Sequence, residues 1–231
     1  MKKIFNIICA SFLLMFIITG CSNPSKETNH DIEVSPAHHL IINTPEDAIN
    51  ELKKGNQRFL ENKMINTNYQ NQIQETKDDQ HPHSFILSCM DSRVPPELIF
   101  DQGIGNIFVA RVAGNIQNED ILGSMEYAAQ IKGTKLILVM GHTNCGGVKG
   151  AIDNVQLGNL TQLVDKIKPA IKGDTTNKKQ MLDETSKENI KMTINNILKG
   201  SPVIQKLVNE KKVIIKGAYY DLATGKVTFF D

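Results

Sequence analysis

The sequence predicts an α/β fold with a parallel-core sheet that helices cover on both faces. Short, continuously apolar runs recur along the chain, and strands buried on both faces of a parallel sheet have this pattern. These runs alternate with longer segments whose apolar residues keep helical spacing. In sheets of this kind, ligands bind beyond the carboxyl ends of the strands, so the residues after each run are the first candidates for a site.

The elements are assigned in order from residue 44. Thr44 is a helix N-cap followed by Pro45 and two acids, and the next apolar residues fall on one helix face, so a helix begins here. We expect buried strands at residues 84–89, 106–111, 135–141 and 212–219, and an edge strand at residues 227–230. Helical spacing predicts helices at residues 117–131, 160–171 and 190–198, with a short helix after Ser201 and a polar loop at residues 173–179.

The composition is that of a globular domain and excludes several classes of protein. Of the 231 residues, 40% are hydrophobic and 22% are charged, which is typical of a folded chain. The 26 basic and 25 acidic residues give a net charge of +1, so no nucleic-acid partner is expected. No apolar run reaches about 18–20 residues, which argues against a protein with several membrane-spanning helices.

The first residues have the pattern of an export signal. Two lysines follow Met1, and an apolar run over residues 4–19 follows them, as in a secretory signal peptide. Ile18-Thr19-Gly20-Cys21 resembles the lipobox of bacterial lipoproteins, in which the cysteine is lipidated and becomes the new N-terminus. We therefore expect a lipoprotein-type signal peptide at residues 1–20 and a lipid anchor on Cys21. The alternative, a transmembrane anchor, needs a run longer than the roughly 16 apolar residues present.

These assignments divide the chain into three parts. After the signal peptide, residues 21–43 are polar, lack a hydrophobic period and are expected to form a flexible tether. Residues 44–231 are expected to form one folded domain. The protein is thus predicted to be exported and held at a bacterial membrane by its lipid alone, in an extracytoplasmic or periplasmic location that permits disulfides.

Two cysteines and a histidine follow neighbouring predicted strands. Cys89 ends the first strand and precedes Asp91 and Arg93, while His142 and Cys145 follow the third strand. Two cysteines and one histidine are a zinc-binding set that leaves a fourth coordination position open. The alternatives are a disulfide between the cysteines, or two buried thiols beside a histidine that belongs to a turn. A disulfide accounts for neither the histidine nor the charged residues, so the pattern favours a metal site.

The motifs around these residues resemble those of the β-class carbonic anhydrases. They are Cys-x-Asp-Ser-Arg at residues 89–93, Arg-Val-Ala-Gly-Asn at 111–115, Glu-Tyr-Ala at 126–128, Gly-His-x-x-Cys-Gly at 141–146 and Gly-Val-Lys-Gly-Ala at 147–151. The resemblance covers residues 44–231 and implies the β-carbonic anhydrase fold, with Zn²⁺ bound by Cys89, His142 and Cys145. It also implies reversible hydration of CO2 to bicarbonate and a proton through zinc-bound hydroxide.

The resemblance further implies roles for other residues. Asp91 is expected to accept a hydrogen bond from the hydroxide while Arg93 holds it in place, and in a closed state Asp91 is itself the fourth zinc ligand. The substrate-binding positions that the family implies are Gln80, Gly146, Phe108 and Tyr127. For Phe108 and Tyr127, which match an apolar pocket near the metal in the family, ordinary core packing is the alternative.

The implied partners are CO2 and bicarbonate, and further copies of the chain in a homodimer or higher even oligomer whose N-terminal helices embrace the neighbour. Two other functions stay open at this point. One is hydrolysis of carbon disulfide or carbonyl sulfide, which some relatives perform on the same scaffold. The other is a non-enzymatic exported lipoprotein that holds a structural zinc ion or a disulfide.

Overall fold

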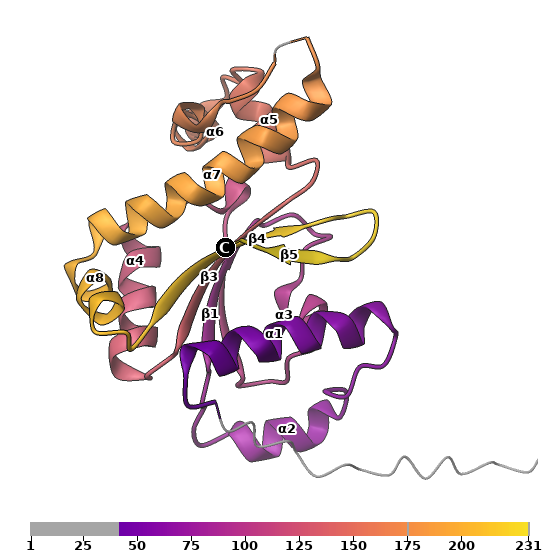
Figure 1. The fold of residues 1–231 in the computed structure, drawn as a ribbon, viewed down its shortest axis with the longest axis vertical. Coiled ribbons are helices and arrows are strands. Elements are labelled where there is room, and N and C mark those ends of the chain that lie inside the picture. Colours follow the sequence, from indigo (N-terminus) through magenta and orange to yellow (C-terminus); the bar gives the residue numbers. More distant parts are fainter. Residues whose placement is uncertain (1–41, 175, 231) are drawn as a thin grey trace, which may run out of the picture. The chain divides into compact units, whose positions relative to one another are not determined.

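The computed structural model describes residues 42–174 and 176–230 of the chain (Figure 1). The predicted signal peptide, the predicted lipidation site at Cys21 and all but the last two residues of the predicted tether lie outside these residues. Within them, helices cover both faces of a five-stranded sheet. No helix in the described ranges is both long enough and apolar enough to cross a membrane.

The strands follow the order β2-β1-β3-β4-β5 across the sheet. The four parallel strands are β1 (Ser84–Ser88), β2 (Ile107–Arg111), β3 (Leu136–His142) and β4 (Ile214–Tyr220), and β5 (Val227–Phe229) pairs antiparallel with β4 at the edge. Every residue of β1 and β3 is buried, which explains their continuous apolar sequences. The predicted α/β fold, with a parallel core and an antiparallel edge strand, is confirmed.

One face of the sheet packs against the first helix. Helix α1 (Pro45–Leu60) and the short α3 (Pro96–Ile99) contact strand residues that include Ile86 and Leu138. The predicted N-cap of α1 is confirmed, because the Thr44 hydroxyl accepts a hydrogen bond from the backbone N–H of Asp47 at 3.1 Å. This helix is therefore fixed both at its start and along its apolar face.

The opposite face packs against helices from the second half of the chain (Figure 1). These are α4 (Glu119–Glu126), α7 (Lys178–Gly200) and α8 (Pro202–Asn209), and they cover strand residues such as Leu87 and Val139. Successive strand residues alternate between the two cores, as a pleated strand requires.

A third apolar cluster lies beyond the carboxyl end of the sheet. It joins α5 (Gly146–Ile152) and α6 (Gly158–Asp165) to Cys89, Cys145 and Val148. The two cysteines are therefore enclosed between the ends of the strands and a layer of small helices, where little solvent reaches them.

Two predicted helices end differently for local reasons. The helix expected at residues 160–171 stops at Asp165, and a 3-10 turn over Lys168–Ala170 follows, because Pro169 lacks the N–H that a continuing helix needs. The helix expected at residues 117–131 consists of α4 and a π-helical turn over residues 127–131.

Other helices start where the sequence prediction placed a loop or no element. Helix α7 begins at Lys178, inside the loop expected at residues 173–179, because the Asn177 side chain caps it. Helix α2 (Tyr69–Thr76) was not predicted, and it buries none of its residues, so its sequence carries no apolar period.

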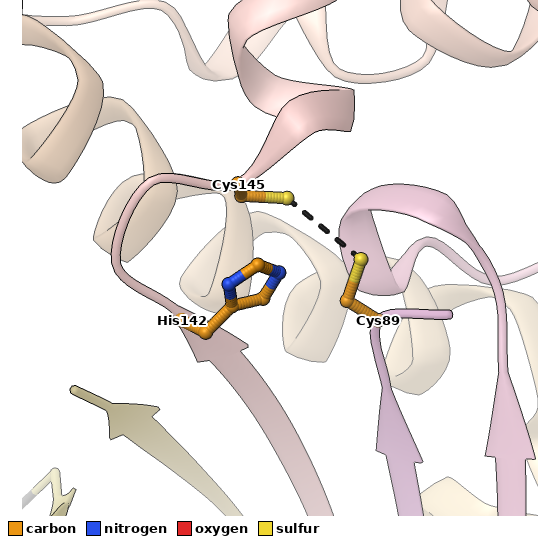
Figure 2. A group of neighbouring side chains, drawn as sticks. All are labelled: Cys89, His142 and Cys145. Carbon is orange, nitrogen blue, oxygen red and sulfur yellow. Dashed lines mark hydrogen bonds between the residues drawn. The ribbon is translucent and has the colours of Figure 1, made fainter. Parts of the chain in front are cut away.

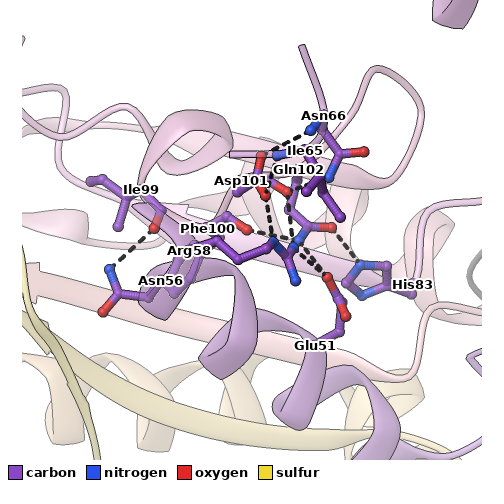
Figure 3. Close-up of polar contacts among 10 residues, drawn as sticks. All are labelled: Glu51, Asn56, Arg58, Ile65, Asn66, His83, Ile99, Phe100, Asp101 and Gln102. Carbon is purple, nitrogen blue, oxygen red and sulfur yellow. Dashed lines mark hydrogen bonds and ion pairs between the residues drawn. The ribbon is translucent and has the colours of Figure 1, made fainter. Parts of the chain in front are cut away.

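A buried polar network ties α1 to the segment that follows α3 (Figure 3). Asp101 is fully buried and accepts hydrogen bonds from Arg58 Nε at 2.5 Å and from the backbone N–H of Asn66 at 3.1 Å. The Arg58 guanidinium also contacts Glu51 at 2.8 Å. The network lies at the amino end of the sheet and stabilises the packing of α1 against the rest of the domain.

Candidate metal centre

Three buried side chains converge at the carboxyl end of the sheet (Figure 2). Cys89 directly follows β1, His142 is the last residue of β3, and Cys145 precedes α5. Their candidate ligand atoms all lie within 4.8 Å of one another. Because β1 and β3 are paired neighbours with Ser88 opposite Met140, their ends open onto the same edge, as the sequence predicted.

The turn between His142 and Cys145 brings both side chains to one point. Asn144 has a left-handed backbone with φ +55°, which lets the chain reverse within three residues. The next helix then packs closely on a neighbouring turn, since a Cβ atom at Gly147 would lie 2.9 Å from the backbone nitrogen of Gly114. Glycine is therefore needed at this position.

The two cysteines are free thiols. Their sulfur atoms are 3.9 Å apart, about twice the roughly 2.05 Å length of a disulfide bond. The two sulfur atoms share a hydrogen bond, and this contact lowers the pKa of Cys89 and raises that of Cys145. The arrangement favours a thiolate, the form of cysteine that binds metals.

The imidazole of His142 completes a donor set that fits zinc. Its Nδ1 lies 2.9 Å from the backbone oxygen of Thr143, a contact that places the ring proton on Nδ1 and leaves Nε2 as a free acceptor. Within the described ranges, Nε2 is buried and has no hydrogen-bond partner. A buried nitrogen without a partner is costly, and a metal ion held together with the two sulfurs would satisfy it.

A charged pair borders the three candidate ligands. Asp91 accepts two hydrogen bonds from the Arg93 guanidinium, at 2.9 and 2.7 Å, and these hold the pKa of its carboxyl well below the usual range. The Asp91 Oδ2 atom lies 4.0 Å from His142 Nε2. An ionised hydrogen-bond acceptor is thus fixed beside the cluster.

Arg111 is a further residue of this site, and the sequence suggested no separate role for it. It is the last residue of β2, and its guanidinium donates to the backbone oxygens of Cys89 at 3.2 Å and Asp91 at 2.5 Å. These bonds hold the loop that carries the candidate ligand and the carboxylate. A charged residue that ends a largely apolar strand was the available signal.

The expected substrate-binding residues are divided between two places. Gly146 begins α5 next to Cys145, whereas Gln80 precedes β1 and lies towards the opposite end of the sheet. Phe108 pairs with Phe85, four residues before Cys89 and so about 13 Å along the strand. Within one chain, Gln80 and Phe108 therefore do not join the metal cluster.

Phe108 and Tyr127 nevertheless meet at a site of their own, whose wall also carries the acids Glu119 and Asp120. Their ring centroids are 6.3 Å apart at an interplanar angle of 65°. Both rings line a cavity of about 720 Å³ together with Phe85 and Gly123. This cavity lies against residues 108–110 in the middle of β2, the strand at the edge of the sheet.

Comparisons with known proteins agree with this geometry. Residues 84–227 match the family model described as carbonic anhydrase. The chain is 30% identical over 193 residues to carbonic anhydrase 2 of Mycobacterium tuberculosis. This alignment covers 81% of this chain and 93% of the relative.

Solved structures share the fold. The structure titled as that of the β-carbonic anhydrase CcaA superposes with a TM-score of 0.64 and 25% identity, over 80% of this chain and 95% of that one. A tetrameric β-carbonic anhydrase from the ascomycete Sordaria macrospora gives a TM-score of 0.64 at 22% identity, over 80% of this chain and 97% of that one.

Proposed function

We propose that this chain, which belongs to the β-class carbonic anhydrase family, binds zinc and catalyses the reversible hydration of CO2 to bicarbonate and a proton. Family membership makes it a carbonic anhydrase, an enzyme of the lyase class. The observation that supports the zinc proposal most directly is the cluster of Cys89, His142 and Cys145, with a buried imidazole nitrogen that lacks a partner in the described ranges.

In this proposal, the two sulfurs and His142 Nε2 are the protein ligands. Zinc, when bound, supplies a Lewis acid that lowers the pKa of a water ligand towards about 7 and so provides a nucleophile. The Thr143 carbonyl, 2.9 Å from Nδ1, keeps the imidazole in the tautomer that presents Nε2. Arg111 holds the backbone of Cys89 and Asp91 in place.

Asp91 is the proposed acceptor that orients the attacking hydroxyl. Its carboxylate is ionised because Arg93 donates to both oxygens, so it accepts and does not donate a hydrogen bond. An acceptor fixed on one side turns the hydroxyl lone pair towards the carbon of CO2. The backbone N–H of Gly146, at the start of α5, is a candidate donor to a bicarbonate oxygen.

We infer that Gln80, Phe108 and Tyr127 serve the metal centre of a second copy in a homodimer or larger even oligomer. Gln80 and Phe108 lie away from the cluster in their own chain, and Phe108 belongs to the edge strand β2. The tetrameric relative from Sordaria macrospora supports an oligomer. The signal peptide at residues 1–20, the tether at 21–43, the lipid on Cys21 and the exported location remain proposals from the sequence.

A hydration assay combined with metal analysis tests the proposal. The protein without residues 1–20 is purified, its zinc content is measured, and CO2 hydration is followed by stopped flow with a pH indicator. We expect one zinc ion per chain and a rate well above the uncatalysed one. A protein without zinc, or one that turns over carbon disulfide or carbonyl sulfide but not CO2, would overturn it.

A further inference from the structure

Thr143 lies between the imidazole of His142 and the turn at residues 221–226 that joins β4 to β5. Its backbone oxygen lies 2.9 Å from His142 Nδ1, the contact that fixes the tautomer of the ring. Its backbone N–H donates to the Tyr220 oxygen at 2.9 Å. Its hydroxyl accepts a hydrogen bond of 3.0 Å from the backbone N–H of Leu222. The proposed mechanism uses only the first of these contacts.

The hydroxyl bond adds a fixed point that the sheet alone does not provide. Strand β3 ends at His142, so Thr143 is the first residue beyond it. The Thr143 N–H belongs to the peptide before its Cα atom, and its carbonyl belongs to the peptide after it. The bond to the Tyr220 oxygen therefore fixes only one side of the residue. Together with the hydroxyl bond to Leu222, it sets the direction of the Cα–C bond that carries the carbonyl.

The β4–β5 turn is itself held in place, both by α1 and by its own backbone. Asn56 of α1 is 5% exposed, and its side chain donates to the Gly225 oxygen at 3.0 Å and accepts from the Val227 N–H at 2.9 Å. Within the turn, the Gly225 N–H donates to the Asp221 oxygen at 2.8 Å. Leu222 packs against the apolar core that α1 covers. The Leu222 N–H is therefore a well-fixed donor for the Thr143 hydroxyl.

We propose that Thr143 is a positioning residue for the metal centre: its hydroxyl, bound to the Leu222 N–H, fixes the Thr143 carbonyl that holds the His142 imidazole. Contacts of this kind set the tautomer and the ring orientation of a histidine that binds a metal. The two bonds that transmit the effect measure 2.9 and 3.0 Å, the usual lengths of such hydrogen bonds. The inference rests on the proposed zinc site and adds to it a link to the β4–β5 turn.

The same turn supplies a matched control for this proposal. The Thr224 hydroxyl also accepts a hydrogen bond, from the backbone N–H of Lys226 at 3.3 Å. This bond stays within the turn and does not reach His142. Thr143→Val and Thr224→Val make the same chemical change, and each takes one hydroxyl acceptor from a backbone N–H of the turn. Only the first acts on the residue whose carbonyl contacts the imidazole.

The experiment follows the ring proton of His142 and the release of zinc in the protein without residues 1–20. Nitrogen-15 NMR of the zinc-loaded protein measures the exchange of the Nδ1 proton with water, and release of zinc to a chromophoric chelator is timed. We expect Thr143→Val to release zinc about 10-fold faster, the lower end of the effect of outer-shell partners. Its Nδ1 proton should also exchange faster, because the carbonyl that accepts it is less well fixed. Thr143→Ser keeps the hydroxyl and should restore both rates.

The control and the serine variant decide what the result means. Thr224→Val should match the wild type in both measurements. Equal changes in the two valine variants, wild-type proton exchange in Thr143→Val, or a Thr143→Ser protein that behaves like Thr143→Val would overturn the positioning role. If Thr143→Val does not fold, Thr143→Ala removes the same hydroxyl and is judged by the same criteria. A wild-type protein that binds no zinc would instead refute the proposed function, and exchange of the Nδ1 proton in the metal-free variants would still decide whether Thr143 holds the ring.

Discussion

Asp91 and Arg93 form a forked ion pair at the border of the metal cluster. Arg93 Nε donates to Asp91 Oδ1 at 2.9 Å, and Arg93 Nη2 donates to Oδ2 at 2.7 Å. The backbone N–H of Arg93 adds a 3.0 Å bond to Oδ1. The carboxylate is therefore held by one residue in a conformation that leaves Oδ2 4.0 Å from His142 Nε2.

Replacement of Arg93 by alanine should lower CO2 hydration about 10- to 100-fold, the range typical of outer-shell partners of a metal site. Without the guanidinium, the Asp91 carboxylate is free to turn towards the ligand atoms and to occupy the fourth position on the metal. Zinc content should stay at one ion per chain, because no ligand is removed. Stopped-flow hydration and metal analysis on the same sample measure both effects.

Arg93→Lys is the control for this prediction. Lysine keeps the positive charge but contacts the carboxylate as a point charge and not as a fork, so its rate should lie between those of the wild type and Arg93→Ala. Unchanged turnover in Arg93→Ala would show that the ion pair does not hold Asp91 for catalysis.

Cys145→Ser should lose zinc and activity together. Cys145 supplies one of the two sulfurs of the cluster, and a serine hydroxyl is a poor zinc ligand. Zinc should fall from one ion per chain to a small fraction, and hydration should fall to the uncatalysed rate. Ser88→Ala is the control, since Ser88 adjoins Cys89, is buried and makes no side-chain hydrogen bond in the described ranges. A Cys145→Ser protein with full zinc would exclude Cys145 as a ligand.

The sheet and the cluster were predictable from the sequence because both depend on buried, contiguous segments. Strands covered on two faces have continuous apolar runs, so β1 and β3 were located within one residue at each end. Once these strands are neighbours in a parallel sheet, Cys89 and His142 must meet at its carboxyl edge.

The residues that the sequence did not assign act through contacts between distant segments. Arg111 bonds two backbone oxygens on another strand's loop, and Asn189 reaches a carbonyl 75 positions away. The Asn189 contact leaves no periodic or local pattern, and the only local sign of Arg111 is a charged residue at the end of an apolar strand. The family resemblance likewise named Phe108 and Tyr127, but where they lie relative to Cys89 and His142 depends on how separate segments of the chain pack together.

Asp101→Asn should destabilise the fold far more than a surface charge change. Asp101 is fully buried and accepts bonds from Arg58 Nε and from the backbone N–H groups of Ile65 and Asn66 (Figure 3). An asparagine keeps one acceptor oxygen but turns an NH2 group towards at least one of these donors, and it removes the negative charge that faces the Arg58 guanidinium. We expect a loss of about 3 kcal/mol in the free energy of unfolding, measured by urea denaturation.

An exposed ion pair provides the control for Asp101→Asn. Lys149 and Asp153 are 2.6 Å apart on the surface of α5 and its end. Asp153→Asn should leave the free energy of unfolding almost unchanged, since exposed pairs contribute little. Equal effects of the two substitutions would show that the α1 network is not a specific source of stability.

His83 should make the stability fall with pH in the mildly acidic range. It is 6% exposed and bridges Ser84 Oγ at 2.8 Å and Gln102 Oε1 at 2.9 Å, and burial lowers the pKa of its imidazole. Below the unfolded pKa of about 6.5, the unfolded chain binds a proton that the folded chain does not. The free energy of unfolding therefore falls as the pH falls towards the folded pKa.

Urea denaturation of the zinc-loaded protein between pH 7.5 and roughly pH 5 measures this effect, with a slope for one proton of at most about 1.4 kcal/mol per pH unit. His83→Gln should flatten the curve, because it removes the group whose protonation differs between the two states. His81→Gln should follow the wild type, since the His81 side chain is 86% exposed. Parallel curves for the wild type and His83→Gln would mean that His83 binds protons equally in both states, against the buried position described here.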